Sequence, residues 1–352
     1  MKIPRFSILD AVTVRDYETP SDAVRKTVEA AKYAESLGYY RYWFPEHHGE
    51  MQFASAAPAI LIGRIAEATR MIRVGAGGVM LLNHSPLVVA EQFATLESLY
   101  PGRIDLGLGR AVGSDKSREE KTKAALLRPS NITGDDFERY VRDVLEYLGS
   151  SSSDDKVLAS PGKDTHVPLY LLSTGGLTAK LAGALGLPFA YATHIAPKSL
   201  LTSIQDYHES FRPSATLKMP YLIVSALASL AETDAQAQKN LTSFNQVRLT
   251  IARGGRRTLP PPVDSMEGLW TEQEAEIVGR KSAYGIIGSR ETATGKIQSL
   301  LEQTRADELI FLTDTYYDED RYRSFAMLAE IMHQFGQDAQ RTAPNAESVT
   351  LT

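Results

Sequence analysis

The chain has 352 residues, of which 43% are hydrophobic and 23% charged, with a formal net charge of -5. These values are ordinary for a globular protein and allow one large α/β barrel or two smaller domains. Charges of both signs are interspersed along the chain and indicate no basic face, so we expect no nucleic-acid partner. No apolar run approaches the roughly 20 residues that span a bilayer, and no signal pattern opens the chain, so we expect a cytoplasmic protein with no membrane partner. The absence of cysteine excludes disulfides and cysteine nucleophiles.

Strand and helix patterns alternate along most of the chain. An apolar segment over residues 3–9 predicts the first strand, and Thr19-Pro20 predicts the start of a helix that ends at Gly38. Further strands are expected over 39–44, 71–82, 103–108, 168–172, 187–193, 219–227 and 308–313. Further helices are expected over 56–68, 86–99, 135–148, 178–185, 198–211, 291–303 and 319–334. Eight strands joined by right-handed crossovers favour one (β/α)8 TIM-type barrel over residues 1–352.

Two polar segments, about 111–166 and 250–285, interrupt this alternation and are expected to be insertions at the barrel mouth. The second contains Gly254-Gly255 and Trp270, which suit a hinged lid with an apolar cover over a substrate. The main alternative fold is a doubly wound sheet, whose dinucleotide-binding form needs a G-x-G-x-x-G turn. Glycines between Gly107 and Gly113 have a similar spacing, but Arg110 and a polar segment replace the expected helix start.

The most informative stretch is YYRYWFPEHHGE, over residues 39–50. Its aromatic residues suit a buried strand that Pro45 ends, and Glu46, His47 and His48 then follow at a strand end, where barrels carry their chemistry. We expect His47 to be the catalytic acid or base and His48 to orient its neighbour, bond Glu46 or contact substrate. Adjacent residues at a strand end point in different directions and no further ligand set is evident, so we expect no metal.

A phosphate site is predicted at the ends of the fourth and fifth strands. The sequence STGGLT, over 173–178, lies between a strand and a helix, where free N–H groups, two glycines and threonine hydroxyls suit an anion. Arg110 follows the neighbouring strand and offers a charged fork to the same anion, unless it pairs with Glu46 or Asp115. The expected cofactor-binding residues here are Arg110, Val112, Thr174, Gly175, Gly176 and Thr178.

Two other strand ends suggest contacts to ligands. Glycines interrupt the third strand at Gly75, Gly77 and Gly78, and since glycine weakens strands, they indicate a close approach to a flat ligand or a strained peptide bond. His194 ends the sixth strand and either contacts substrate or caps a loop. The residues expected at the mouth include no acidic or basic cluster that would indicate a charged substrate.

Taken together, these segments resemble the bacterial luciferase-like flavin-dependent monooxygenase family along nearly the whole chain. The resemblance is carried by WFPEHHG (43–49), RVGAGGVML (73–81), LYPGRIDLGLGR (99–110), TGGLTAKLAGALGLP (174–188), GSRET (288–292) and ADELIFLT (306–313). It implies a (β/α)8 barrel, usually a homodimer, that binds reduced FMN (FMNH2) at its mouth. We expect a separate reductase to supply the reduced flavin. The resemblance also implies that O2 reacts through a flavin hydroperoxide to oxidise a small organic substrate.

The resemblance also assigns roles to individual positions. His47 matches the family's catalytic histidine, and Gly77-Gly78 matches a non-proline cis peptide against the flavin ring. Arg110 and the segment 174–178 match its phosphate contacts. The chain departs from the light-emitting members, because Gly109 replaces a reactive cysteine and Thr174 replaces an acid. These departures argue against luminescence and leave the oxygenase role intact.

Three alternatives remain open at this stage. The same family includes enzymes that use a deazaflavin for hydride transfer without oxygen. A non-catalytic flavin-binding protein would need the same phosphate site. An unrelated barrel enzyme for sugar phosphates would need only the STGGLT segment and would leave Gly77-Gly78 without a purpose.

Overall fold

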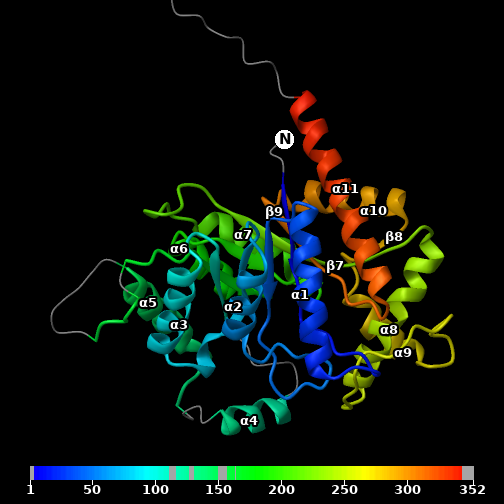
Figure 1. Cartoon of the computed structure of the whole chain (residues 1–352), viewed down its shortest axis with the longest axis horizontal. Coiled ribbons are helices and arrows are strands. Elements are labelled where there is room, and N and C mark those ends of the chain that lie inside the picture. Colours follow the sequence, from blue (N-terminus) through cyan, green and yellow to red (C-terminus); the bar gives the residue numbers. More distant parts are fainter. Residues whose placement is uncertain (1–3, 111–115, 127–130, 150–156, 163, 343–352) are drawn as a thin grey trace, which may run out of the picture.

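The computed structural model describes residues 4–110, 116–126, 131–149, 157–162 and 164–342. Its core is a closed barrel of eight parallel strands, as the sequence predicts (Figure 1). In order around the barrel these are β1 (Arg5–Leu9), β2 (Arg41–Phe44), β3 (Arg73–Met80), β4 (Ile104–Gly109), β5 (Leu169–Ser173), β6 (Phe189–Tyr191), β7 (Leu222–Leu230) and β9 (Glu308–Leu312). Pairing of Arg5 with Glu308 closes the barrel between β1 and β9.

A ninth strand was not predicted. The short β8 (Ile286–Gly288) pairs with the last residues of β7, from Ala228 to Leu230, beyond the part of β7 that pairs with β9. Three residues are too few to give a readable alternation of side chains, which is why sequence pattern missed it.

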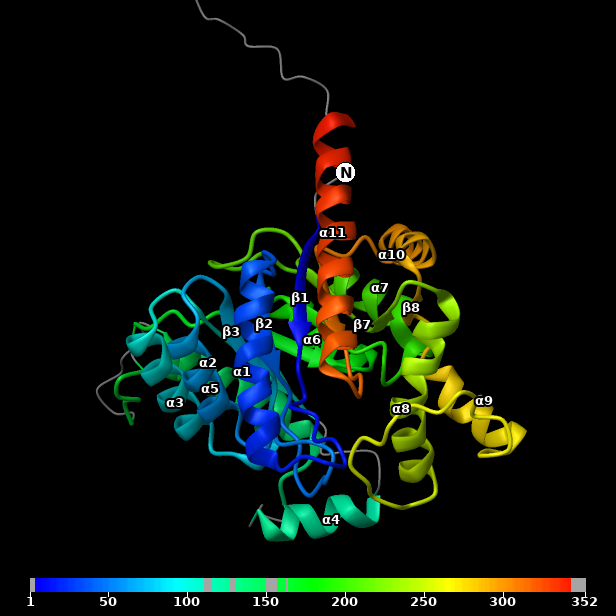
Figure 2. The same cartoon turned by 45° about the vertical axis from the view of Figure 1, so that its right-hand side comes forward.

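Helices cover the outside of the barrel. They are α1 (Pro20–Ser36), α2 (Pro58–Ala68), α3 (Pro86–Leu99), α4 (Lys116–Ala125), α5 (Phe137–Leu148), α6 (Gly176–Ala184), α7 (Leu200–Ser210), α8 (Asp234–Ala252), α9 (Glu272–Arg280), α10 (Arg290–Thr304) and α11 (Asp318–Thr342). Figures 1 and 2 place α4 below the end of the barrel that lies away from the N-terminus. In contrast, α5 packs against α3, so this part of the first predicted insertion belongs to the outer helix layer.

The helix signals in the sequence act as expected where they are strong. Thr19 accepts the backbone N–H of Asp22, whose carboxylate bonds back to Thr19, and Pro20 begins α1. Gly38 follows the helix with φ +80°, a conformation that glycine adopts at little cost. Three helices, α4, α8 and α9, were not predicted. The buried face of α8 includes Asn240, Thr242 and Ser243, so it lacks the apolar periodicity by which helices are recognised.

A buried ion-pair cluster closes the floor of the barrel, at the end where its strands begin. Arg41 contacts Asp105 at 2.7 Å and Glu308 at 2.8 Å. Arg73 pairs with the same Asp105 at 2.6 Å, and Tyr221 donates to Glu308 at 2.7 Å. Each buried charge is therefore matched by an opposite charge. The floor of the barrel stabilises the fold, and the mouth, where the strands end, is available for chemistry.

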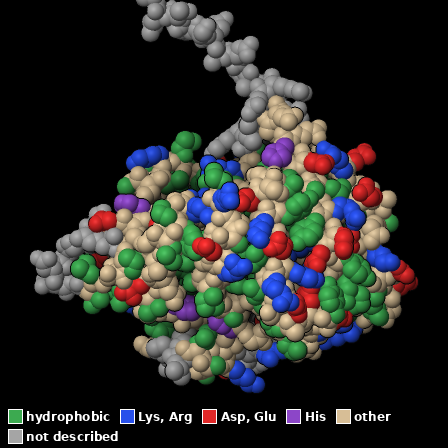
Figure 3. All heavy atoms as spheres, viewed as in Figure 1, with side chains coloured by type: hydrophobic (Ala, Val, Ile, Leu, Met, Phe, Trp, Pro, Cys, Tyr) green, Lys and Arg blue, Asp and Glu red, His purple; other side chains and the backbone are tan. Residues whose placement is uncertain are grey.

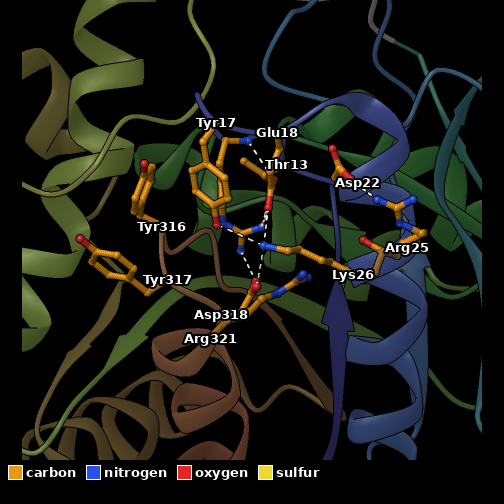
Figure 4. Close-up of polar contacts among 12 residues, drawn as sticks. Thr13, Tyr17, Glu18, Asp22, Arg25, Lys26, Tyr316, Tyr317, Asp318 and Arg321 are labelled. Carbon is orange, nitrogen blue, oxygen red and sulfur yellow. Dashed lines mark hydrogen bonds and ion pairs between the residues drawn. The ribbon is translucent and has the colours of Figure 1, made fainter.

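A second ion-pair network fixes the loop after β1 to the start of α11 (Figure 4). Lys26 lies 2.5 Å from Glu18 and 2.6 Å from Asp318, and Arg15 pairs with Asp318 at 2.9 Å. Arg321 pairs with Asp10 at 2.8 Å just beneath. Asp10 therefore serves the scaffold at this strand end.

The surface in Figure 3 mixes acidic and basic side chains over the visible face, in line with the interspersed charges of the sequence. In the described part of the chain, no helix combines the length and apolar character needed to cross a membrane.

Candidate active site at the barrel mouth

Glu46 is the anchor of the site at the end of β2. Its side chain is buried, with only 4% exposed, and one carboxylate oxygen accepts the backbone N–H of Met80 at 3.0 Å. The other oxygen lies 2.6 Å from Nε2 of His48 and 2.8 Å from Nε2 of His84. Burial alone would raise the pKa of Glu46, but the hydrogen bonds from His48 and His84 outweigh it and lower the pKa to about 2. Glu46 is therefore an anion that ties β2 to the loop after β3.

His84 was not singled out from the sequence. The signal that would have found it is positional, because His84 lies four residues after the end of β3, just as Glu46 and His48 lie two and four residues after the end of β2. The ligand-type atoms of Glu46, His48 and His84 lie within 4.8 Å of one another. The sequence-based expectation that no further candidate ligand accompanies Glu46 and His48 was therefore wrong, because His84 is one. Hydrogen bonds among the three already account for their arrangement, so the absence of a metal stays a prediction.

His47 lies beside this cluster in a different environment. Its backbone N–H donates to the carbonyl of Ser55 at 3.3 Å, and its ring packs on Phe53 with centroids 4.6 Å apart. No described residue forms a hydrogen bond with its ring nitrogens. Burial, with a smaller contribution from the charge of His48, lowers the pKa of His47 from 6.5 to about 4. The imidazole is thus neutral at physiological pH and is available to accept a proton.

His194 faces His47 from the other side of the mouth. It follows β6, which is four strands from β2 in the closed barrel, and its Nδ1 lies 2.8 Å from Oγ of Ser225. Burial, then the charges of Arg248, His47 and Lys281, lower the pKa of His194 to about 3. The two histidines therefore lie at the same end of the barrel, within electrostatic reach of each other, and both are neutral at physiological pH.

The glycines of β3 have a packing explanation that sequence reasoning did not find. A Cβ on Gly75 would lie 2.5 Å from the carbonyl of Asp105, and one on Gly78 would lie 2.7 Å from that of Gly107. A Cβ on Gly77 would meet Leu9 at 2.7 Å. Cβ atoms on Gly75 and Gly78 would meet backbone atoms, so their contacts require glycine with or without a ligand, whereas one on Gly77 would meet the end of the flexible Leu9 side chain. The Gly77-Gly78 peptide bond is cis, as the resemblance implies.

The predicted anion cradle is assembled at adjacent strand ends. Pairing of Gly109 with Leu172 places Arg110 beside Ser173, where β5 leads into α6. Gly175 caps α6 without any side-chain hydrogen bond, and no atom lies within 4 Å of the position that a Cβ on Gly175 would take. The N-terminus of α6 is open on the side of Gly175, whereas the carboxylate of Asp206, which pairs with Lys180, lies against Gly176. The open side, with an arginine at the adjacent strand end, fits a phosphate. Thr174, Gly176 and Thr178 belong to the same turn, and Val112 lies outside the described residues.

Trp270 is not brought to this site. It packs against Leu249, Met266 and Val278, and it lines a cavity of about 900 Å³ between α8, α9, β8 and α10. The lining of this cavity includes neither His47 nor Arg110. The second insertion reaches the mouth at another point, where Leu259 pairs with the backbone of Val14 and Asp16 after β1. Its role as a lid and the contact of Trp270 with substrate stay predictions.

Two basic residues of the mouth were missed by sequence reasoning. Arg248, near the end of α8, and Lys281, just after α9, both act on His194. They are 33 positions apart in a region where no local pattern links them, so only the folded chain brings them together.

Comparison with known proteins agrees with this architecture. Residues 5–308 match the family model of luciferase-like monooxygenases. The chain is 37% identical over 329 residues to a luciferase-like monooxygenase of Escherichia coli K12, covering 94% of this chain and 97% of that protein. It is 31% identical over 317 residues to the N-acetyl-S-alkylcysteine monooxygenase of Bacillus subtilis, covering 90% and 91% of the two chains. The crystal structure of apo-MsnO8 superposes with a TM-score of 0.82 at 33% identity, covering 94% of this chain and 98% of that one.

More distant structures share the fold alone. The oxygenating constituent of 3,6-diketocamphane monooxygenase from Pseudomonas putida, solved with FMN, has a TM-score of 0.68 at 15% identity and covers 94% of this chain and 98% of that one. An F420-dependent secondary alcohol dehydrogenase, solved with an F420-acetone adduct, has a TM-score of 0.61 at 17% identity with the same coverage. From the family model, the close relatives and the barrel together, this chain belongs to the luciferase-like monooxygenase family.

Proposed function

We propose that the protein is a monooxygenase that takes reduced FMN from a separate reductase and uses O2 to oxidise a small organic substrate. One observation carries the proposal, namely the uncapped N-terminus of α6, open at Gly175 and lying beside Arg110 at the end of β4. Such a cradle suits the phosphate of FMN. When bound, reduced FMN would supply two electrons and two protons, so that one atom of O2 enters the substrate and the other leaves as water.

The residues of the mouth divide the remaining work. Arg110 and the turn over 174–178 hold the phosphate, and the flat ring lies against the backbone of the Gly77-Gly78 peptide. His47 is neutral at physiological pH and accepts a proton at its ring nitrogen, which it returns later in the cycle. Glu46 fixes the loop that carries His47 and keeps its negative charge. Closure of the mouth would exclude water during the reaction.

The cofactor is testable without a known substrate. Titration of the protein with FMN, followed by flavin fluorescence, should give saturable binding that Arg110→Gln weakens about tenfold or more, because a charge-assisted fork to phosphate is lost. Arg142→Gln removes an exposed arginine of α5 that pairs with Glu138, and it serves as the control. Binding of coenzyme F420 in preference to FMN would favour the alternative, a deazaflavin-dependent hydride transfer.

Turnover then separates an oxygenase from a flavin-binding protein. The name of the Bacillus relative makes N-acetyl-S-alkylcysteines the first substrates to try. With a reductase, NADH and 18O2, the proposal predicts one labelled oxygen atom in the product. Tight FMN binding without oxygen-dependent product from any tested thioether, aldehyde or acid would support a non-catalytic flavin-binding protein.

A further inference from the structure

One buried arginine of this protein lacks the partner that the others have. The structure describes four buried arginines, and three form ion pairs: Arg15 with Asp318 at 2.9 Å, Arg41 with Asp105 at 2.7 Å and Arg321 with Asp10 at 2.8 Å. Arg248 is 8% exposed, and no described carboxylate forms an ion pair with it. Its Nη1 donates to the neutral Oγ of Ser282 at 2.8 Å, and its guanidinium lies 4.5 Å from the ring centroid of Phe244.

A second cation lies beside it. Lys281 is partly buried, and no described residue forms a hydrogen bond or ion pair with it. Burial, and then the charge of Arg248, lower the pKa of Lys281. The acid whose charge reaches Arg248 is Asp314, which instead accepts the hydroxyl of Thr13 at 2.6 Å. Burial also raises the pKa of Asp314. Bringing two cations out of water without a counter-ion is unfavourable, so an anion from outside the chain would stabilise this arrangement.

The fold brings these cations to the mouth side of the barrel, because Arg248 lies near the end of α8 and Figure 2 shows α8 running beside the barrel toward the end where α4 lies. Both act electrostatically on His194, as does His47 from the opposite side of the mouth. The ends of β6 and β9, which carry His194 and Asp314, flank β7 in the barrel order. The cations thus occupy the sector over β6, β7 and β9, whereas the phosphate cradle lies at the ends of β4 and β5. The two anion sites are therefore separate parts of one mouth.

We propose that Arg248 and Lys281, with His194 beside them, bind the carboxylate of the substrate, so that the protein oxidises organic acids. A planar carboxylate matches the two parallel N–H donors of a guanidinium, and the ammonium of Lys281 adds a second charge. This inference rests on the proposed function, because it places the reacting part of the acid between His47 and His194. It also replaces the expectation from sequence that no charged cluster marks the substrate site.

The test uses a charged ligand and a neutral ligand of nearly the same shape. The full-length protein, saturated with FMN so that the phosphate cradle is filled, is titrated calorimetrically with octanoate and with octanamide. We expect octanoate to bind at least about tenfold more tightly, because only the carboxylate accepts charge-assisted hydrogen bonds. Arg248→Gln should remove this preference, Arg248→Lys should restore part of it, and Lys281→Gln should reduce it. Arg280→Gln is the matched control, because Arg280 is exposed and pairs with Glu276 on its own helix.

Each outcome bears on the inference separately from the proposed function. FMN affinity and Tm, measured for every variant, establish that the fold and the phosphate cradle are intact. Equal affinity for octanoate and octanamide in the wild type, or an unchanged preference in folded Arg248→Gln and Lys281→Gln, would overturn the inference. Loss of FMN affinity in Arg248→Gln with unchanged octanoate binding would assign Arg248 to the flavin phosphate and also overturn it. Selective octanoate binding without oxygen-dependent turnover of any acid would uphold the carboxylate site and reject the proposed function, together with the oxidation of acids that rests on it.

Discussion

At the scale of single residues, the adjacent His47 and His48 lie in different environments. His48 bonds to the carboxylate of Glu46, whereas His47 packs on Phe53 and has a lowered pKa. A neutral imidazole beside a fixed anion suits proton transfer better than a pair of cations would. The adjacent positions therefore have different roles, with His47 facing the reaction and His48 completing the scaffold.

Replacement of His47 by alanine should separate binding from chemistry. We expect His47→Ala to bind FMN as tightly as the wild type, because the cradle is untouched, and to lose about 100-fold or more of its turnover. His208→Ala removes an exposed histidine of α7 and should behave as wild type. Undiminished product formation by His47→Ala would remove His47 from the mechanism.

The buried histidines should also make the fold sensitive to acid. Their pKa values fall from 6.5 to about 4 for His47 and about 3 for His194, so between these values and 6.5 the unfolded chain binds more protons than the folded one. Stability therefore rises with pH in this range, and it is lost as the pH falls from 6.5 toward 4. Urea unfolding at pH 7 and pH 5 should show a smaller loss for His47→Asn/His194→Asn than for the wild type. An equal loss in both proteins would contradict this account.

Sequence reasoning found those site residues that sit directly after a strand with a strong pattern. His47, Arg110 and the turn over 174–178 are of this kind. Arg248 and Lys281 escaped it, because their proximity arises from the return of the chain through α8 and α9, and no local spacing reveals it. The glycines of β3 were recognised as unusual, but their packing against Asp105 and Gly107 is a property of the closed barrel.

At the scale of elements, the beginnings of the barrel strands stabilise the fold and their ends form the candidate site. The beginnings of β2, β4 and β9 supply Arg41, Asp105 and Glu308 to the buried floor cluster. The ends of β2 and β3 supply the Glu46 cluster, and the ends of β4 and β5 supply the cradle. Stability and chemistry can therefore be changed independently by substitutions at opposite ends of the same strands.

Removal of one partner from the floor cluster should be costly. Arg41→Met leaves Asp105 and Glu308 buried with part of their charge unmatched, so we expect a loss of about 3–5 kcal/mol in the free energy of unfolding. Arg290→Gln breaks the exposed pair with Glu330 and should cost less than about 1 kcal/mol. Urea denaturation of both variants checks the difference, and similar losses would argue against the role given to the floor.

A substitution at the N-terminus of α6 should weaken FMN binding without lowering stability. A side chain at Gly175 meets open space, and its φ of -160° is extended backbone that any residue adopts. Gly175→Asp should therefore fold with an unchanged or higher Tm, since aspartate caps helices well. Its carboxylate would fill the phosphate cradle and repel the phosphate of FMN, so FMN affinity should fall about tenfold or more. Unchanged FMN affinity would place the phosphate elsewhere.

Predictability differs among the elements for a physical reason. Barrel strands and outer helices bury one apolar face each, so their periods and caps were readable, as in α1 with Thr19 and Pro20. The buried face of α8 contains Asn240 and Arg248, and α4 is polar except for two alanines at its end, so neither shows the apolar stripe of an ordinary helix.

At the scale of the whole molecule, the outer surface suggests how copies of the chain associate. Large hydrophobic side chains stand exposed on and beside α2 and α3, including Ile60 at 74% and Leu99 at 63%. Neighbouring Met71 and Val88 are exposed as well. We propose a homodimer through these two helices, because a twofold contact between them would bury exposed apolar side chains.

If α2 forms the dimer interface, a charge introduced on its exposed face should prevent dimerisation. Ile60→Glu should convert a dimer of the wild type into a monomer in sedimentation velocity, while the barrel itself stays folded. Ile277→Glu on α9 removes an exposed isoleucine far from the patch along the chain and should leave the dimer intact. A wild-type monomer at all accessible concentrations would contradict the proposed interface.

The central claim is that the barrel mouth binds FMN through Arg110 and the N-terminus of α6, with the ring between β3 and His47. A crystal structure of the protein grown with FMN tests it most directly. The account predicts flavin density with its phosphate against residues 174–178 and Arg110 and its ring beside Gly77-Gly78. Density for the flavin at any other place, or an empty mouth at FMN concentrations that saturate the protein in solution, would contradict it.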